Sequence, residues 1–238
     1  HFSFHGGVFL RDSMRLFATI VRGEDGLYSI ELTRGYCDGR CSFCRRCYEN
    51  QDILKPVNTY EDDFYEKHFV NHQARVAGLC AKVAEYIALE QKKATVLIQA
   101  ALLHDIGKIF VPGPVFMKNG KLTPEEFEVV KCHAVLGAFY LKGRGFPASV
   151  TEAVKYHHER YDGAGYPDGL KGGRIPLSAR ILAACDAADA MLAGRHYRAA
   201  ISRKMVIDEL LRNSGSQFDP DVVGVMVEII NEEAVVNV

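Results

Sequence analysis

Hydrophobic positions recur with two different periods along the chain, and the change falls near residue 57. Before it, the runs RLFATIV (15–21) and LYSIEL (27–32) are short, rich in β-branched and aromatic residues, and separated by RGEDG. This pattern predicts a β-hairpin. After Pro56, apolar residues recur at steps of three and four, the period of an amphipathic helix. We therefore expect a small N-terminal module over residues 1–57 and a helical domain over residues 58–238.

Helical periodicity governs the larger part of the chain, and neither a strand signal nor an internal repeat is visible from Glu61 onward. A capping box from Thr123 to Glu126, with Pro124 in the first helical position, marks the start of one helix. The run 93–109 is apolar on nearly every side, so we expect that helix to be buried. The expected helices cover residues 68–88, 93–109, 122–141, 149–158 and 177–192. The predicted fold class is therefore mainly all-α.

Composition and charge exclude several classes of partner. The chain has 238 residues, with 29 basic and 30 acidic side chains and a formal net charge of −1. A general nucleic-acid or anionic-membrane surface would need a basic excess. No apolar run reaches the roughly 18 residues of a membrane span. The chain shows no signal-peptide pattern and begins with His rather than Met, so we expect a cytoplasmic fragment of a longer polypeptide.

The seven cysteines fall into two groups. Three stand singly in predicted helices, where a small buried thiol is expected: Cys80, Cys132 and Cys185. Four crowd into CDGRCSFCRRC: Cys37, Cys41, Cys44 and Cys47. Because disulfides are rare in cytosolic chains, this crowding indicates a metal site, separate from any other in the chain. Structural zinc, an iron–sulfur cluster and uncoordinated or redox-active thiols stay open. Part of the spacing matches radical SAM enzymes, but no strand–helix repeat that could build their barrel surrounds it.

Metal-capable side chains lie on or beside the apolar faces of the predicted helices. They are His72, His104, Asp105, His133, His157, His158 and Asp186. An unpartnered polar group there costs about 1–3 kcal/mol, so such groups need partners. Single core histidines usually find a carbonyl, but several helices each directing imidazole or carboxylate inward favour a metal centre. Five imidazoles and two carboxylates are too many ligands for one ion. Two ions that share Asp105 as a bridge fit this number of ligands. Such ligands suit iron, manganese, zinc or nickel better than calcium or magnesium.

The residue types also indicate a reaction. Two ions about 3.5–4 Å apart can hold a hydroxide between them and clamp the oxygens of a phosphate. Lys108 lies one helical turn beyond His104, so we expect it to project toward the same region and to neutralise a phosphoryl oxygen. By itself Lys108 would be a surface lysine. Phosphoester hydrolysis is the expected reaction class.

Several motifs in order resemble a known family. HDIGK (104–108) resembles the signature of HD-type phosphohydrolases, and HHERYDGAGYP (157–167) resembles the hallmark of their HD-GYP subgroup. RIPLSARILAACDAADAM and QFDP follow as in that family, so the likeness runs from about Tyr60 to Phe218. The resemblance implies an HD-type helical bundle in a bacterial protein, and a non-haem centre of two or three metals, usually iron. It implies hydrolysis of cyclic di-GMP to pGpG, and onward to GMP, by a metal-bridging hydroxide.

The resemblance also assigns site residues by motif. The implied metal ligands are His72, His104, Asp105, His133, His157, His158 and Asp186, and Lys108 would contact phosphate. Arg195 and Arg198 would line the phosphate and base side of the substrate groove, unless they are merely solvated. Asp189, one turn after Asp186, would orient a ligand or the attacking water.

The glycine-rich segment after His158 must turn sharply, which accounts for Gly163 and Gly165. Tyr166 and Pro167 would then form a lip of the substrate groove or a surface for a partner, such as a GGDEF-type protein. A homodimer is a further expectation.

His68 departs from part of the family pattern. Members with three metals have a glutamate four residues before the first ligand histidine, and here that position is His68. Without the extra carboxylate, a third ion would leave excess positive charge in a partly buried site. We therefore expect two firmly held ions, with His68 either a marginal ligand or a capping or packing residue.

Two alternatives to cyclic di-GMP hydrolysis remain. The substrate could be another cyclic or linear dinucleotide, such as cyclic GMP–AMP, because no residue reads a guanine edge clearly. The protein could also be a regulatory binding protein that acts through its GYP loop. The intact set of ligands argues against the second alternative. The N-terminal module would be a sensor or a zinc knuckle.

Overall fold

A computed structural model describes residues 4–9, 14–22, 28–36, 71–112, 115, 118, 120–193 and 201–236 of the chain. For the three N-terminal ranges, for Asn71 and for residues 233–236 it describes the backbone alone. Some sequence predictions lie outside the described residues: Cys37, Cys41, Cys44, Cys47, His68, Arg195, Arg198 and the domain boundary at residue 57. The chain divides into two compact units, which we describe separately.

The first unit contains an antiparallel sheet together with residues 107–133. Its strands are β1 (Phe4–Phe9), β2 (Met14–Arg22) and β3 (Tyr28–Tyr36), in the order β1-β2-β3. β2 and β3 pair from Met14 opposite Tyr36 to Arg22 opposite Tyr28, which is the pairing expected of the predicted hairpin. β1 was not expected from the sequence. Whether residues 1–57 form a separate module stays a prediction.

Helix α6 (Pro124–Gly143) begins with the predicted capping box. The backbone N–H of Thr123 donates to Glu126 Oε2 at 2.7 Å, and the N–H of Glu126 donates to Thr123 Oγ1 at 3.2 Å. These two bonds satisfy N–H groups that a helix start leaves without partners. Lys118 Nζ also binds Glu126, 2.7 Å from Oε2, and lowers the pKa of this carboxyl group. The capping prediction is confirmed.

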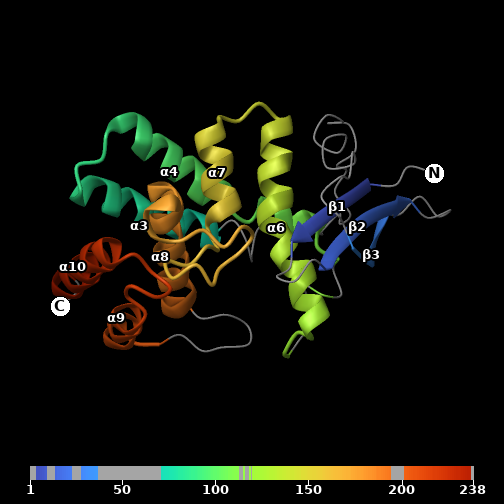
Figure 1. Ribbon diagram of the computed structural model, residues 1–238. Helices are drawn as coiled ribbons and strands as arrows, with labels where there is room; N and C mark the ends of the chain where they lie inside the picture. Colours follow the sequence, from blue (N-terminus) through green and yellow to red (C-terminus); the bar gives the residue numbers. More distant parts are fainter. Residues whose placement is uncertain are drawn as a thin grey trace. The chain divides into compact units, whose positions relative to one another are not determined.

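The second unit is a bundle of helices around α8 (Figure 1). Its helices are α3 (Asn71–Tyr86), α4 (Gln91–Leu103), α7 (Ala148–Tyr156), α8 (Leu177–Leu192), α9 (Arg203–Arg212) and α10 (Pro220–Val236). α8 packs against α3, α4, α7, α9 and α10. The bounds of α8 are those that the sequence predicts. The mainly helical fold class is thus confirmed for the described part of the larger region. None of the described helices is long and apolar enough to cross a membrane.

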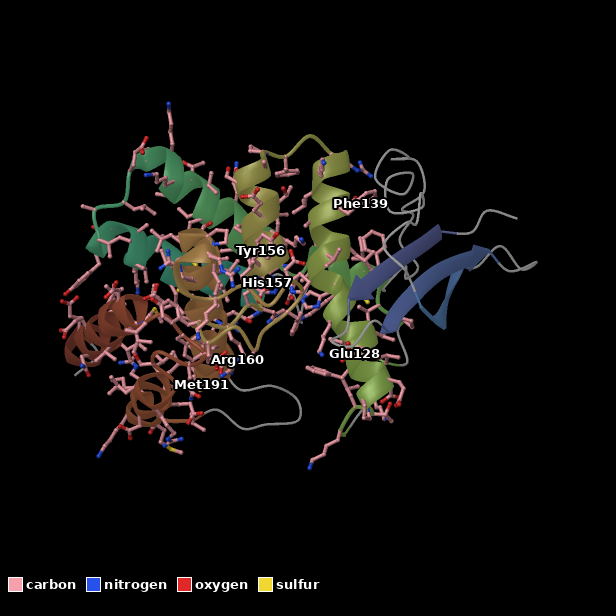
Figure 2. All side chains as sticks on the ribbon, viewed as in Figure 1. Glu128, Phe139, Tyr156, His157, Arg160 and Met191 are labelled. Carbon is pink, nitrogen blue, oxygen red and sulfur yellow. The ribbon has the colours of Figure 1, made fainter. Side chains whose placement is uncertain are left out.

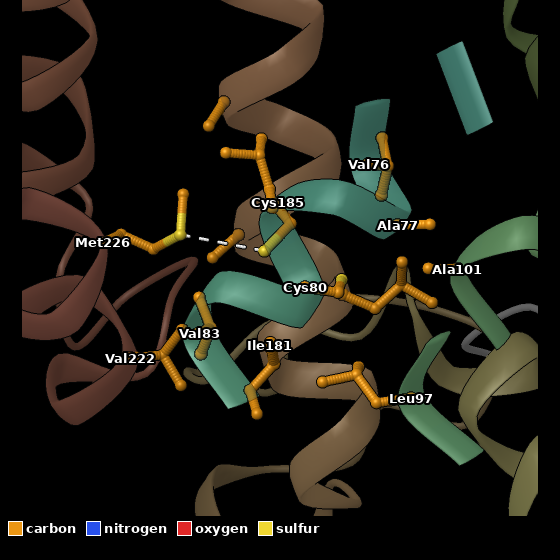
Figure 3. Close-up of a cluster of buried hydrophobic side chains, with 14 of the residues drawn as sticks. Val76, Ala77, Cys80, Val83, Leu97, Ala101, Ile181, Cys185, Val222 and Met226 are labelled. Carbon is orange, nitrogen blue, oxygen red and sulfur yellow. Dashed lines mark hydrogen bonds between the residues drawn. The ribbon is translucent and has the colours of Figure 1, made fainter. Parts of the chain in front are cut away.

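One side of α8 faces an apolar core shared with α3, α4 and α10 (Figure 3). Its residues include Val76, Cys80, Val83, Leu97, Ile181, Cys185, Val222 and Met226, all buried. Small residues such as Ala184 and Ala188 let neighbouring helices approach α8 closely. Cys185 Sγ lies 3.7 Å from Met226 Sδ. Cys80, Cys132 and Cys185 are buried free thiols, so the prediction for the single cysteines is confirmed.

The helix expected over residues 93–109 is shorter than predicted and less buried. α4 ends at Leu103, and residues 106–110 form the 3-10 helix η3 (Ile106–Phe110). Gly107 favours helix poorly, which accounts for the early end of α4, and the ring of His104 donates from Nδ1 to the carbonyl of Ala101 in its last turn. Lys108 therefore does not lie on the same α-helix as His104. α4 is buried on one side only, since Leu102 is 44% exposed.

Candidate metal centre

Four polar side chains from α3, the end of α4 and α8 converge in the second unit. His72 Nε2 lies 3.2 Å from Asp186 Oδ1 and 3.9 Å from Asp105 Oδ2. His104 Nε2 lies 3.4 Å from Asp105 Oδ2 and 3.9 Å from Asp186 Oδ1. All four side chains are largely buried, and that of Asp186 is the most exposed at 15%. The structure thus brings together four of the residues that the sequence singles out.

These separations suit a metal ion. Ligand atoms about 2.0–2.2 Å from one ion, at angles near 90–109°, lie roughly 2.8–3.6 Å from one another, so two of the four separations fall in this range and two are slightly longer. The Nε2 atoms of His72 and His104 are buried and make no hydrogen bond within the described residues. A buried polar group without any partner costs about 1–3 kcal/mol, and the nearest groups to these two nitrogens are the carboxylates at 3.2 and 3.4 Å. A cation placed among the four side chains would satisfy both nitrogens and both carboxylates, so the residues fit a divalent ion.

In three histidines, a hydrogen bond from the ring to a backbone carbonyl fixes which ring nitrogen carries the proton. In each, Nδ1 lies 2.6 or 2.7 Å from the carbonyl oxygen three residues earlier: His104 to Ala101, His133 to Val130 and His157 to Val154. A carbonyl only accepts, so Nδ1 must donate and Nε2 is left with its lone pair. His104 and His157 follow the last residues of α4 and α7 (Tyr156 and His157 are labelled in Figure 2), whereas His133 lies inside α6. Nε2 is therefore the nitrogen available to a metal.

His72 is held differently, by side chains. Its Nδ1 donates to Asp189 Oδ2 at 2.7 Å. Arg75 donates two hydrogen bonds to the same carboxylate, from Nε to Oδ1 at 2.6 Å and from Nη2 to Oδ2 at 3.0 Å. Burial alone would raise the pKa of Asp189, but His72 and Arg75 outweigh it and lower that pKa. Sequence reasoning found Asp189 but missed Arg75, whose only signal is its place one turn after His72.

The charges around His72 favour its protonated form when no metal is bound. Burial lowers the pKa of His72, but the carboxylates of Asp186 and Asp189 and the charge of Asp105 raise it to about 9. The pKa of buried His104 is also raised, because Asp105 and Asp186 outweigh its burial. That of Asp186 is lowered, because the neighbouring histidines outweigh its burial. A cation must therefore displace protons to bind here.

A second group of histidines continues from the first. The rings of His72 and His104 lie 5.3 Å apart between centroids, those of His104 and His157 5.3 Å, and those of His157 and His158 4.0 Å. His157 and His158 belong to the second unit and His133 to the first, so a second ion held by all three stays a prediction. Within the second unit, His157 and His158 thus extend the row of imidazoles that begins at His72 and His104.

The loop after His158 turns as sharply as its glycines predict. Gly163 has a positive φ of 85°. A Cβ on Gly165 would lie 2.3 Å from the backbone nitrogen of Arg160 and 2.6 Å from the carbonyl oxygen of His158, so only glycine fits. Tyr166 follows, and its ring stacks on that of His158 with centroids 4.9 Å apart. The close turn lets Tyr166 lie directly against a candidate ligand.

Glu159 holds the returning half of this loop. Its carboxylate is buried and accepts the backbone N–H groups of Asp168 at 2.7 Å and Leu170 at 3.0 Å. Burial raises the pKa of Glu159, although these bonds oppose the effect. Sequence reasoning did not single out this residue, because a glutamate beside a polar loop looks like any solvated one. Its role is visible only once the loop is folded back.

The segment before α10 ties the loop to the bundle. Tyr161 N–H donates to the Gln217 carbonyl at 3.2 Å, and Asp162 N–H donates to the Ser216 carbonyl at 2.8 Å. Asp219, which is buried, forms an ion pair with Arg180 of α8 and accepts the N–H of Asp221 at 2.9 Å. The QFDP motif therefore supports the loop and the start of α10.

Comparison with known protein families finds one match along most of this region. A family model described as an HD domain matches residues 63–222. That range includes every described candidate ligand. It also covers more than half of the chain.

Curated relatives share this region. A cyclic di-GMP phosphodiesterase response regulator of Xanthomonas campestris is 43% identical over 155 residues, which are 64% of this chain and 40% of that one. A cyclic di-GMP phosphodiesterase of Thermotoga maritima is 37% identical over 187 residues, 78% of this chain and 50% of that one. A 3'3'-cGAMP-specific phosphodiesterase of Vibrio cholerae is 34% identical over 159 residues, 66% of this chain and 30% of that one. The chain thus spans half or less of the length of each.

A solved structure shows the same fold. An HDG"Y"P protein from Bdellovibrio bacteriovorus aligns with a TM-score of 0.59 at 20% sequence identity. The alignment covers 79% of this chain and 63% of that protein. At this identity the likeness concerns the helical fold alone.

Proposed function

The chain belongs to the HD domain family, in its HD-GYP type, and we propose that it is a metal-dependent phosphodiesterase acting on cyclic di-GMP. The observation that carries the proposal is the pair of buried Nε2 atoms on His72 and His104, which lack hydrogen bonds and face two carboxylates. Without a metal, the carboxylates of Asp105 and Asp186 could serve these nitrogens only as ion pairs with protonated histidines. The two named cyclic di-GMP phosphodiesterases among the relatives support the substrate.

Two ions would be held by the two groups of side chains. The first would bind His72, His104, Asp105 and Asp186, and the second His133, His157 and His158. We propose that Asp105 bridges them, because it is the carboxylate nearest to His104, which lies between the groups. Imidazole with carboxylate suits iron, manganese, nickel or zinc, and we propose iron.

The protein's own residues would do the remaining work. When bound, divalent ions act as Lewis acids that activate water and neutralise phosphoryl oxygens. The Nδ1–H bonds of His104, His133 and His157 fix the tautomer, so the Nε2 atoms of these three rings would be the ones to hold the ions. Asp189 does the same for His72. We further propose that Lys108 contacts a phosphoryl oxygen of the substrate, and that Tyr166, stacked on His158, borders the substrate.

A second substrate is supported by one observation. The relative from Vibrio cholerae that is 34% identical is named as specific for 3'3'-cGAMP. The two cyclic dinucleotides differ in one base, and the catalytic residues above concern only the phosphates. We propose that Arg195 and Arg198 line the phosphate and base side of the substrate groove. For assembly, we propose a GGDEF-type protein partner and a homodimer.

The decisive experiment compares substrates on one metal-loaded preparation. The protein is loaded with Fe(II) or Mn(II) without oxygen and assayed with cyclic di-GMP, 3'3'-cGAMP and pGpG. We expect cyclic di-GMP to be cleaved to pGpG, with slower formation of GMP. Cleavage of 3'3'-cGAMP alone would replace the substrate. A metal-loaded protein that cleaves none of the three would contradict the proposed activity.

A further inference from the structure

Arg75 stands out because it binds Asp189, and Asp189 in turn binds the candidate ligand His72. It lies one helical turn after His72 on α3, and its side chain is 48% exposed. Asp189 lies on α8, and its side chain is 5% exposed. The bonds run from Arg75 to Asp189 and from Asp189 to His72. A half-exposed surface residue is therefore linked to a buried histidine through a single carboxylate.

From this geometry we infer that Arg75 is a positioning residue of the metal centre, which sets the orientation of His72 through Asp189. The inference rests on the proposed function, because it assumes that His72 binds an ion through Nε2. It extends that proposal by adding a residue that neither touches the ion nor belongs to a family motif quoted above.

Arg75 can orient His72 because it fixes the plane of the Asp189 carboxylate that lies between them. A carboxylate that accepts one hydrogen bond can rotate about its last bond, and the imidazole would follow it. The fork of Arg75 gives Asp189 two nearly parallel bonds, which fix the plane of the carboxylate. His72 Nδ1 then meets Oδ2 in one direction only, and Nε2 points toward Asp186.

His72 depends on this link more than the other histidines depend on theirs. His104 and His157 donate to carbonyls of their own helices, so their rings are fixed by local backbone. The His72 ring is fixed across the interface of α3 and α8. Loss of Arg75 should therefore affect the ion at His72 and leave the ion at His157 and His158 unchanged.

A merely structural role would give a different result. α3 and α8 already pack through buried Val76, Val83 and Ile181, so the helices do not need Arg75 to stay together. If Arg75 only clamps the helices, its loss lowers thermal stability and leaves metal affinity alone. If it positions His72, metal affinity changes more than stability.

The test measures metal binding and not only catalysis. Metal-free protein is titrated with Co(II) against a competing chelator, and the visible absorption of Co(II) reports the number and kind of ligands. For Arg75→Gln we expect one of two bound equivalents to weaken about tenfold, and for Asp189→Asn about 10–100-fold. Arg75→Lys, which keeps the charge but not the fork, should fall between native protein and Arg75→Gln.

A matched control removes another arginine–carboxylate pair. Arg212→Gln on α9 breaks an ion pair with Glu209 that has no link to the centre, and it should bind both equivalents as the native protein does. Thermal melts of the metal-free variants check folding. Unchanged affinity and spectrum in Arg75→Gln would overturn the inference while leaving the proposed function intact. Failure of the native protein to bind Co(II) would overturn both.

Discussion

Two neighbouring residues of α8, Cys185 and Asp186, belong to opposite halves of the bundle. Cys185 packs among apolar side chains of α3 and α10 and against Met226, a half that is complete in itself (Figure 3). Asp186 faces histidine nitrogens that have no hydrogen-bond partner in the described residues. One half is thus stabilised by packing, and the other holds the side chains of the proposed metal centre. The fold and the metal centre should therefore respond separately to substitution.

The largest effect is expected when Asp105, the proposed bridging carboxylate, is removed. Asp105→Ala should abolish hydrolysis of cyclic di-GMP and reduce bound metal, because Asp105 lies near the nitrogens of both His72 and His104. Circular dichroism should show the same helix content as native protein, since the apolar half is untouched. Asp208→Ala, at an exposed position on α9, is the matched control and should keep full activity. Turnover retained by Asp105→Ala would disprove the bridging role.

A strong loss of activity is also expected from Gly165→Ala. The new Cβ would meet the backbone of Arg160 and His158 at 2.3–2.6 Å, so the loop must open and Tyr166 must leave His158. Gly173→Ala is the control, because its Cβ would enter open space. Steady-state hydrolysis by the two variants should differ by at least about tenfold. Equal rates would mean that the closed loop is not needed.

The apolar half can be weakened without touching the metal half. Leu97→Ala in α4 should lower the free energy of unfolding by about 2–5 kcal/mol, because Leu97 is fully buried. Its metal stoichiometry at low temperature should equal that of native protein. Denaturant unfolding and elemental analysis measure the two quantities. A loss of bound metal at a temperature where Leu97→Ala is folded would show that the halves are not separate.

The pH dependence of metal-free protein should reveal the charges of the metal half. The pKa of His72 is raised to about 9 in the folded protein, so the protonated ring adds stability at low pH. That contribution is complete below the unfolded pKa, near 6.5, and is lost as pH rises through 9. It amounts to on the order of 3 kcal/mol. Denaturant unfolding in the presence of chelator, at pH 6 and at pH 9.5, measures this contribution. Between the two pH values, the free energy of unfolding should fall less for His72→Ala than for native protein. Equal falls in both proteins would contradict this origin.

Local patterns in the sequence predict the parts that depend on local chemistry. The bounds of α8, the capping box of α6 and the sharp turn at Gly163 and Gly165 follow from spacing and from side-chain properties of neighbouring residues. The gathering of His72, His104, Asp105 and Asp186 follows from their apolar helix faces together with the family motifs. These features need no knowledge of which helices meet.

Long-range partners could not be predicted in this way. Arg75 reaches Asp189 across 114 positions of sequence, and no period connects them. Glu159 meets a backbone that only the folded loop presents. The end of α4 at Leu103 was missed because the apolar pattern continues past it into residues 106–110. The first two cases depend on contacts that exist only after folding.

The bonds from residues 161 and 162 to residues 216 and 217 can form only after the later residues have been synthesised. A ribosome adds about 5–20 residues per second, so the later residues emerge roughly 3–11 seconds after the loop they hold. Until then Tyr161 and Asp162 lack their final partners, while the ligand histidines of α3, α4 and α7 have already emerged. The nascent chain therefore presents most of its imidazoles before the loop beside them is anchored. The proposed metal centre would therefore gain its anchored loop only late in synthesis.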